Sequence, residues 1–180
     1  MIEHVFVREQ SNNFAKEELV SFKVFVSYST NDLPQVEKLQ QQLKGTPVDV
    51  FVAENSVSPS QDLAQAINSA IEQCDLFVLI WSKHAEASKW VSQEIGKATA
   101  LRKKILPLVL DDGMSLPGFI QNLKYLPVHK DPADALSKAR SIIVEAYEEK
   151  ALRESAAAQA EKDKLALMGI GAFLLWVFSK

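Results

Sequence analysis

Short apolar runs and amphipathic helical segments alternate along most of this chain, and this alternation limits the folds that it can adopt. The runs are rich in β-branched and aromatic residues, as the buried strands of a parallel sheet are. They occupy residues 22–29, 48–52, 75–81, 105–110 and 125–128. Because parallel strands are joined by right-handed helical crossovers, the sequence predicts an α/β fold with a five-stranded parallel sheet covered by helices on both faces.

The segments between these runs place apolar residues at helical spacing. Helices are therefore predicted over 33–43, 62–73 and 88–103. In the last of these helices, Val91 and Ile95 are expected to face the core.

Four parts of the chain differ in pattern. They are an N-terminal extension without a clear pattern at 1–21, the α/β domain at 22–147, a helical stalk at 148–164 and an apolar C-terminal segment at 165–180. A long helix begins at Asp131-Pro132, where an acidic N-cap precedes proline. We expect this helix to continue unbroken until Gly169, so that it runs from the domain through the alanine-rich stalk.

The C-terminal segment has two interpretations. Residues 165–178 carry no charge, and at about 1.5 Å per residue they would cover roughly 21 Å, short of the roughly 30 Å hydrocarbon core of a bilayer. Lysines before the run, with Trp176 and Lys180 at its far end, would anchor it at the two interfaces. We therefore expect either a tail anchor in the inner membrane or a helix that associates with its own copies.

The composition excludes several classes of function. A net charge of −3 provides no basic surface for nucleic acid. Cys74 is the only cysteine and the 3 histidines are scattered, so neither an internal disulfide nor a metal site is expected. The first residues lack the apolar stretch of a signal peptide. We therefore expect a cytoplasmic domain without a resident cofactor.

A ligand crevice is expected where the strand order reverses. In an open α/β sheet with the order 2-1-3-4-5, this point lies outside the carboxyl ends of strands 1 and 3. The candidate binding residues lie at or just after the ends of the first and third runs and are Ser27, Tyr28, Ser29, Asp32 and Ser82.

The helix after the third run carries Trp90 and Glu94 one turn apart, at the edge of its apolar stripe. On their own, such residues are more often a packing indole and a solvated carboxylate. Their place beside the crevice makes Trp90 a candidate binding residue and Glu94 a candidate catalytic residue. A receiver domain shares this sheet order but needs acidic residues after strands 1 and 3. Here the acidic pair Asp111-Asp112 follows strand 4, and no glycine-rich phosphate loop is present.

Several ordered segments resemble one known family. They are KVFVSYSTND, AENSVSPSQDL with the helix AQAINSAIEQCD, LFVLIWS, KWVSQEIGKA and KKILPLVL. Over about 22–129 they resemble a Toll/interleukin receptor (TIR) domain of the bacterial type. The resemblance implies a flavodoxin-like sheet and, for many members, cleavage of the nicotinamide glycosidic bond of NAD, with a role in anti-phage defence or signalling. It places the catalytic glutamate of the family's W-x-x-x-E motif on Glu94, and the S-Y-S turn on 27–29.

The resemblance also implies self-association through TIR surfaces. The loop that mediates assembly in the family falls on 53–61, and its candidate residues are Glu54, Asn55, Val57, Ser58 and Pro59. This loop departs from the family pattern because the usual Pro-Gly is Pro59-Ser60, and Cys74 stands where serine is common. The lost glycine affects the conformation of the loop, and hence the assembly mode, more than the chemistry.

One carboxylate is sufficient for the implied reaction. Nicotinamide departs neutral, so no acid has to protonate it, and a carboxylate that holds the sugar hydroxyls stabilises the oxocarbenium-like ribose. Three interpretations stay open: an NAD-cleaving enzyme, a non-catalytic scaffold that recruits other TIR domains, and a nucleoside deoxyribosyltransferase, which also uses a carboxylate on a flavodoxin-like sheet. The joint presence of Trp90, Glu94 and the S-Y-S turn favours the NAD-cleaving enzyme.

Overall fold

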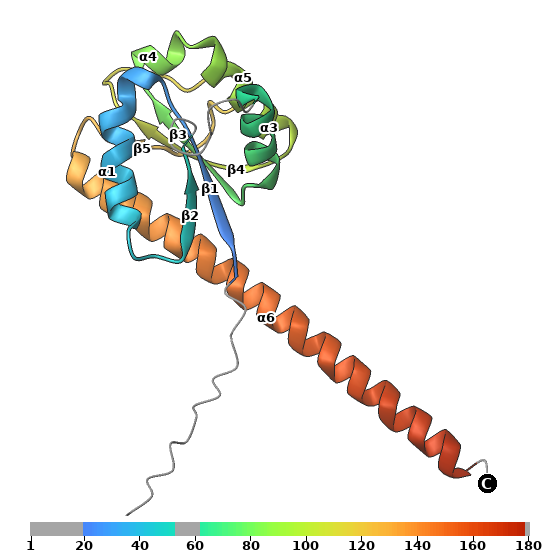
Figure 1. The fold of residues 1–180 in the computed structure, drawn as a ribbon. Coiled ribbons are helices and arrows are strands. Elements are labelled where there is room, and N and C mark those ends of the chain that lie inside the picture. Colours follow the sequence, from blue (N-terminus) through green and yellow to red (C-terminus); the bar gives the residue numbers. More distant parts are fainter. Residues whose placement is uncertain (1–19, 53–61, 179–180) are drawn as a thin grey trace, which may run out of the picture.

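The computed structural model describes residues 20–52 and 62–178, with side chains described as far as residue 165. Over these residues the chain forms a five-stranded parallel sheet with the order β2-β1-β3-β4-β5 and a long C-terminal helix (Figure 1). The predicted fold class and strand order are therefore confirmed. The elements are β1 Phe22–Ser27, η1 Thr30–Asp32, α1 Leu33–Leu43, β2 Val48–Phe51, α3 Leu63–Gln73, β3 Leu76–Trp81, α4 Lys83–Glu86, α5 Lys89–Ala100, β4 Lys104–Val109, β5 Leu126–Pro127 and α6 Pro132–Phe178.

Strand β3 lies at the centre of the sheet, between β1 and β4, and all of its residues are buried. Its side chains alternate between the two faces. Leu76 and Val78 belong to one core cluster, whereas Phe77 and Leu79 belong to the other. A strand that is apolar at every position is what a parallel sheet covered on both faces requires.

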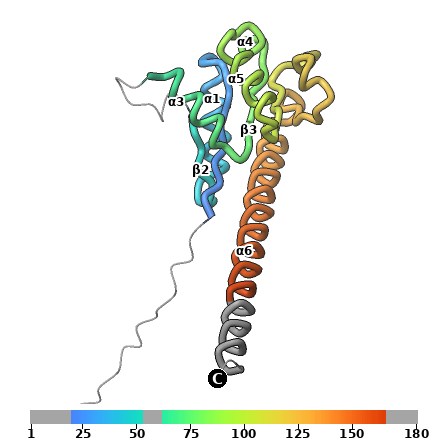
Figure 2. The backbone as a smooth tube through the Cα atoms, turned by 90° about the vertical axis from the view of Figure 1, so that its right-hand side faces the viewer, coloured from blue at the N-terminus to red at the C-terminus, as the bar shows by residue number. Residues whose placement is uncertain are grey.

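Helices cover both faces of the sheet (Figures 1 and 2). On one face, α1 and the first half of α6 bury Val36, Leu39 and Ile143. On the other face, α3 and α5 bury Ile71 and Ile95. These residues belong to the apolar stripes of the helices. The core on each face of the sheet therefore follows from the helical spacing of apolar residues in the sequence.

Helix α5 ends at Ala100, earlier than the predicted end near residue 103. The backbone N–H of Arg102 donates to the carbonyl of Thr99 at 3.0 Å, and that of Lys103 donates to the carbonyl of Ala98 at 2.9 Å. Arg102 has a φ of 54°. This Schellman arrangement ends a helix through one left-handed residue. The helix end has no glycine to mark it in the sequence, because arginine occupies the position that glycine usually takes.

Helix α6 packs on the sheet with its first half and projects away from the domain with its second half (Figures 1 and 2). The described side chains from 152 to 165 are all exposed. The helix does not end at Gly169 as predicted but continues to Phe178. A glycine lowers helix stability by only about 1 kcal/mol relative to alanine, so it does not have to end a helix.

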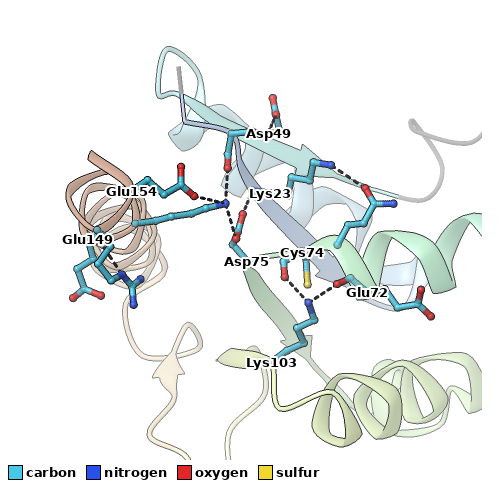
Figure 3. A network of polar contacts seen from close by, with 12 residues as sticks. Lys23, Asp49, Glu72, Cys74, Asp75, Lys103, Glu149 and Glu154 are labelled. Atoms are coloured by element: carbon cyan, nitrogen blue, oxygen red, sulfur yellow. Dashed lines mark hydrogen bonds and ion pairs between the residues drawn. The ribbon is translucent and has the colours of Figure 1, made fainter. Parts of the chain in front are cut away.

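Lys150 fastens α6 to the amino-terminal edge of the sheet, beside Asp75 and Glu154, which Figure 3 shows. Its ammonium donates to the backbone oxygen of Ser21 and to the carboxylate of Asp75, both at 2.8 Å, and lies 3.7 Å from Glu154. The second carboxylate oxygen of Asp75 accepts from the backbone N–H of Lys23 at 2.9 Å. Helix α6 therefore contacts the sheet beyond residue 147, where the α/β domain was expected to end.

Among the residues that the structure describes, none of the helices combines the length and the apolar character needed to cross a membrane. The segment 165–180, for which a membrane anchor and a self-associating helix were the two expectations, belongs to α6 as far as Phe178. Most of the predicted N-terminal extension, residues 1–19, lies outside the described residues.

Candidate functional site

A cavity of about 370 Å³ lies beside the carboxyl end of β1, where α3 and α5 contribute to its walls. Its lining residues are Phe25, Val26, Tyr28, Ser29, Thr30, Leu63, Ile67, Ser88, Trp90 and Glu94. Four of the predicted site residues, Tyr28, Ser29, Trp90 and Glu94, therefore share one cavity. The lining includes no residue from the end of β3, so the cavity lies to the α3 and α5 side of the predicted crevice.

Glu94 is placed at this cavity by the amphipathic pattern of α5. Ser88 caps the helix, because its Oγ accepts from the backbone N–H of Val91 at 3.3 Å. Val91 and Ile95 are buried in the core, which leaves Glu94 partly buried at the edge of the apolar stripe. Ser27, at the end of β1, donates from its Oγ to Oε2 of Glu94 at 2.5 Å. Ser27 itself is buried and is not a lining residue, so it touches the site only through Glu94.

The environment of Glu94 changes its acidity. Burial raises the pKa of Glu94 to about 7, and the hydrogen bond from Ser27 offsets part of this rise because it favours the ionised carboxylate. At neutral pH the carboxyl group is therefore poised between its two protonation states. A carboxyl with a perturbed pKa at a cavity is a candidate for a catalytic group.

Trp90 is an exposed wall of the cavity and not a core residue, since 58% of its surface is exposed. It also lines a second recess of about 270 Å³, which shares Ile67 and Glu94 with the first cavity. Trp90 and Glu94 therefore line two cavities. This arrangement does not fit the alternative in which the indole serves only for packing.

Asp32 and Ser82 are placed differently from the other predicted binding residues. Both are buried, and the Oγ of Ser82 donates to Oδ2 of Asp32 at 2.6 Å. The same Oγ accepts from the backbone N–H of Ala85 at 3.0 Å, which caps α4. Neither residue lines the cavity. The pair joins the segment after β1 to the segment after β3 and so supports the shape of this edge of the sheet.

Helix α3 contributes residues that the sequence analysis did not assign to the site. Leu63 and Ile67 line the cavity from α3, and Thr30 and Ser88 line it from other segments. Leu63 and Ile67 belong to the apolar face of the predicted helix, but nothing in the pattern separates an apolar cavity wall from core. Ser88 is recognisable in the sequence only as a helix cap.

The predicted assembly residues Glu54, Asn55, Val57, Ser58 and Pro59 lie outside the described residues. Within the described part of the chain, no three His, Cys, Asp or Glu side chains are grouped so that they could hold a metal ion. The Cys74 thiol is buried, and burial is the main cause that raises its pKa, which disfavours the reactive thiolate. Among the described residues that line the 370 Å³ cavity, Glu94 is the only one with a carboxyl group.

Comparison with known proteins gives the following matches. A family model described as TIR domain matches residues 24–143. The solved TIR domain of the Toll-related receptor TRR-2 from Hydra magnipapillata is 19% identical, with a TM-score of 0.57, over 68% of this chain and 97% of that chain. A prokaryotic SEFIR domain is 20% identical, with a TM-score of 0.52, over 67% of this chain and 97% of that chain. At these identities the two structures show a shared fold.

A further solved structure, the CMP N-glycosidase BcmB from Clostridium botulinum, is 23% identical, with a TM-score of 0.43, over 57% of this chain and 86% of that chain. This likeness is too small to bear on function. The comparison with curated proteins returned no match.

Proposed function

The chain belongs to the TIR domain family, and we propose that it is an enzyme that cleaves the nicotinamide glycosidic bond of NAD. In this proposal Glu94 is the catalytic carboxylate, and the products are nicotinamide and ADP-ribose or a cyclised form of it. One observation carries the proposal. Glu94 is a partly buried carboxyl that lines a cavity with aromatic walls and is held by the hydroxyl of Ser27.

The ionised form of Glu94 is the one that this reaction needs. Nicotinamide is bonded to ribose as a cationic pyridinium and departs neutral, so it takes up no proton. Positive charge develops instead on the ribose ring, and an adjacent carboxylate stabilises that charge. The bound pyridinium also lowers the pKa of Glu94, because a nearby opposite charge favours the carboxylate. A pKa of about 7 in the free protein is therefore compatible with an ionised group in the complex.

Ser27 is proposed as a positioning residue. Its hydroxyl hydrogen is directed at Oε2 of Glu94, which leaves Oε1 to accept hydrogen bonds from the ribose hydroxyls. Because Ser27 is buried, bulk water does not compete for this contact. A carboxylate held in one orientation loses less freedom when the sugar binds.

The walls of the cavity suit the nicotinamide ring. Tyr28 and Trp90 supply aromatic surface, and Leu63 and Ile67 supply aliphatic surface on the α3 side. Flat aromatic rings are bound well by such surfaces through stacking and apolar contact. Glu94 lies in the same lining, so a ring bound there is next to the carboxylate.

A non-catalytic scaffold is the second candidate function. The bond between Ser27 and Glu94 ties α5 to β1, and a purely structural glutamate would make the same tie. Self-association through the 53–61 loop is part of both proposals, because family sites are commonly completed by a neighbouring molecule. One observation favours the enzyme: in the described part of the chain Glu94 has no ion pair, although buried structural carboxylates are usually paired.

Release of nicotinamide from NAD by the purified full-length protein tests the proposal. We expect the wild type to release nicotinamide, and Glu94→Gln to lower the rate by about 100-fold or more, since removal of one group that stabilises transition-state charge commonly costs this much. Glu86→Gln is the matched control, because Glu86 is an exposed glutamate on neighbouring α4, and it should keep the wild-type rate. Wild-type turnover by Glu94→Gln would disprove the assignment of Glu94, and no turnover by the wild type at assembling concentrations would favour the scaffold.

A further inference from the structure

The second recess beside Trp90 differs in chemistry from the first cavity. Both spaces are lined by Ile67, Trp90 and Glu94. The recess of about 270 Å³ adds the polar side chains of Asn68 and Gln93 and the ammonium of Lys97.

The residues that line the 370 Å³ cavity in the described part of the chain include no lysine or arginine. The two spaces therefore share Ile67, Trp90 and Glu94 as lining residues but differ in chemistry: the cavity offers aromatic and aliphatic surface, and the recess offers a cation and amide groups. Glu94 lines both spaces. A molecule whose scissile bond joins a flat ring to a sugar phosphate would place that bond near Glu94 if its ring occupied the cavity and its phosphate the recess.

Lys97 is the group in the recess that suits an anion. Its Nζ donates to Oδ1 of Asn68 at 2.9 Å and to Oε1 of Glu72 at 2.8 Å. An ammonium has three N–H donors, so the contacts in the described part of the chain leave one donor for a ligand. The side chain of Lys97 is 26% exposed and that of Glu72 is 59% exposed. Glu72 is not a lining residue of the recess, so its carboxylate holds Lys97 from outside the ligand space.

We propose that this recess is a subsite for the phosphate-bearing half of the nucleotide, with Lys97 as its anion-binding residue. The inference rests on the proposed function of the Glu94 cavity. Asn68 and Gln93 offer amide groups that hydrogen-bond phosphate oxygens or sugar hydroxyls. The alternative is a purely structural role, in which Lys97 only clamps α5 to α3 through Glu72 and Asn68.

Binding of the two reaction products separates these roles. Nicotinamide carries no phosphate, whereas ADP-ribose carries two. Their dissociation constants are measured on the full-length protein, by titration calorimetry for ADP-ribose and by ligand-observed NMR for the weaker nicotinamide. In Lys97→Gln we expect the ADP-ribose dissociation constant to rise by about tenfold or more, the loss of one charge-assisted hydrogen bond, and the nicotinamide constant to stay within about twofold. Lys89→Gln, an exposed lysine on the same helix that lines neither space, is the control and should change neither constant.

Glu72→Gln tests the clamp directly, because it removes the carboxylate and keeps the ammonium. If Lys97 binds phosphate, Glu72→Gln binds ADP-ribose as tightly as the wild type or more tightly, since a competing anion is gone. If Lys97→Gln and Glu72→Gln each weaken the binding of ADP-ribose and of nicotinamide by the same factor, Lys97 is a clamp and the subsite is overturned. An ADP-ribose constant that Lys97→Gln leaves unchanged, or a wild type that does not bind ADP-ribose, would overturn it as well.

The same measurements keep the subsite apart from the proposed activity. Binding of ADP-ribose that depends on Lys97 in a wild type that does not cleave NAD would support the subsite and contradict the NAD-cleaving enzyme. Cleavage of NAD by a wild type whose ADP-ribose binding is independent of Lys97 would support the enzyme and contradict the subsite.

Discussion

Asp75 at the amino-terminal edge of the sheet and Glu94 near the carboxyl-terminal edge are both partly buried carboxyls, but their surroundings differ. Asp75 accepts from the Lys150 ammonium at 2.8 Å and from the backbone N–H of Lys23 at 2.9 Å (Figure 3). Glu94 accepts from one neutral hydroxyl, that of Ser27, and burial raises its pKa to about 7. A carboxylate that is paired with a cation and accepts a hydrogen bond from a backbone N–H stabilises the folded state. A carboxyl that is desolvated without a cation costs stability and stays available to a ligand.

This difference follows the construction of a parallel α/β sheet. Ligand sites in such sheets lie outside the carboxyl ends of the strands, where the connections to the following helices form the walls. In this protein the amino-terminal edge is used to fasten α6, whose Lys150 reaches Asp75 and the backbone of Ser21. The two edges thus separate stability from the proposed chemistry, and substitutions at each edge should have opposite effects.

Breaking the paired carboxyl is expected to have the largest effect on stability. Lys150→Met keeps the aliphatic stem of the side chain but leaves Asp75, whose side chain is 24% exposed, without its cation. We expect the free energy of unfolding to fall by about 1–3 kcal/mol, the cost of leaving a partly buried charged group without its partner. Urea unfolding followed by circular dichroism measures this change as a shift of the midpoint.

Lys138→Met is the matched control, because Lys138 lies on the same helix and pairs with Asp134 across an exposed turn. An exposed ion pair of this kind contributes less than about 0.5 kcal/mol, so this variant should unfold close to the wild type. Equal effects of the two substitutions would mean that the contact of Lys150 with the sheet edge adds nothing to the stability of α6.

The sequence predicts more about the Glu94 edge than about the Asp75 edge. The individual strands, the amphipathic stripe of α5 and the position of Glu94 at its border depend on local periodicity, which short segments of sequence carry. The contact of Lys150 with Asp75 joins residues far apart in the chain. Lys150 lies just beyond the apolar stripe of α6, where alanine is the main apolar residue. The sequence pattern around Lys150 therefore indicates a solvated helix and gives no sign of a contact with the sheet.

The candidate site shows the same limit. Tyr28, Ser29, Asp32 and Ser82 all follow the strands that should border a crevice, and their residue types do not tell which of them face it. The structure places Tyr28 and Ser29 at the cavity, and pairs Asp32 with Ser82 away from it. Such pairing depends on where two segments meet in three dimensions, which a single sequence does not record.

Removing the unpaired carboxyl should have the opposite effect on stability. The pKa of Glu94 is raised from 4.5 to about 7, so the folded state holds this proton more tightly than the unfolded state. As the pH rises through this window, the wild type must ionise a desolvated group and loses stability, by about 1–2 kcal/mol in full above pH 7 once solvent screening of this partly buried carboxyl is taken into account. Glu94→Gln lacks this loss, and the Ser27 hydroxyl can still donate to the amide oxygen.

We therefore expect Glu94→Gln to be about 1–2 kcal/mol more stable than the wild type at pH 8 and equal to it near pH 4.5. Urea unfolding of both proteins at the two pH values measures the difference. A variant that is less stable than the wild type at pH 8 would place Glu94 in the same class as Asp75, as a charge that holds the fold together.

The smallest effect concerns the one hydrogen bond that Glu94 accepts. The Ser27 hydroxyl favours the ionised carboxylate, so Ser27→Ala should raise the pKa of Glu94 further above 7. If the ionised form cleaves NAD, kcat/KM of the wild type rises with pH through a midpoint near 7 and then levels off, because this quantity reports the free enzyme. The variant should be about fivefold slower than the wild type at pH 7, where its carboxyl is mostly protonated. At pH 9 it should keep only a smaller defect, which comes from the lost orientation of the carboxylate. The control is Ser92→Ala, which removes an exposed hydroxyl from α5, the helix that carries Glu94. This variant should leave the pH profile of kcat/KM unchanged. If Ser27→Ala lowers kcat/KM by the same factor at every pH, Ser27 acts on the orientation of Glu94 and not on its ionisation. The ionisation of Glu94 would then differ from that of Asp75 through burial alone.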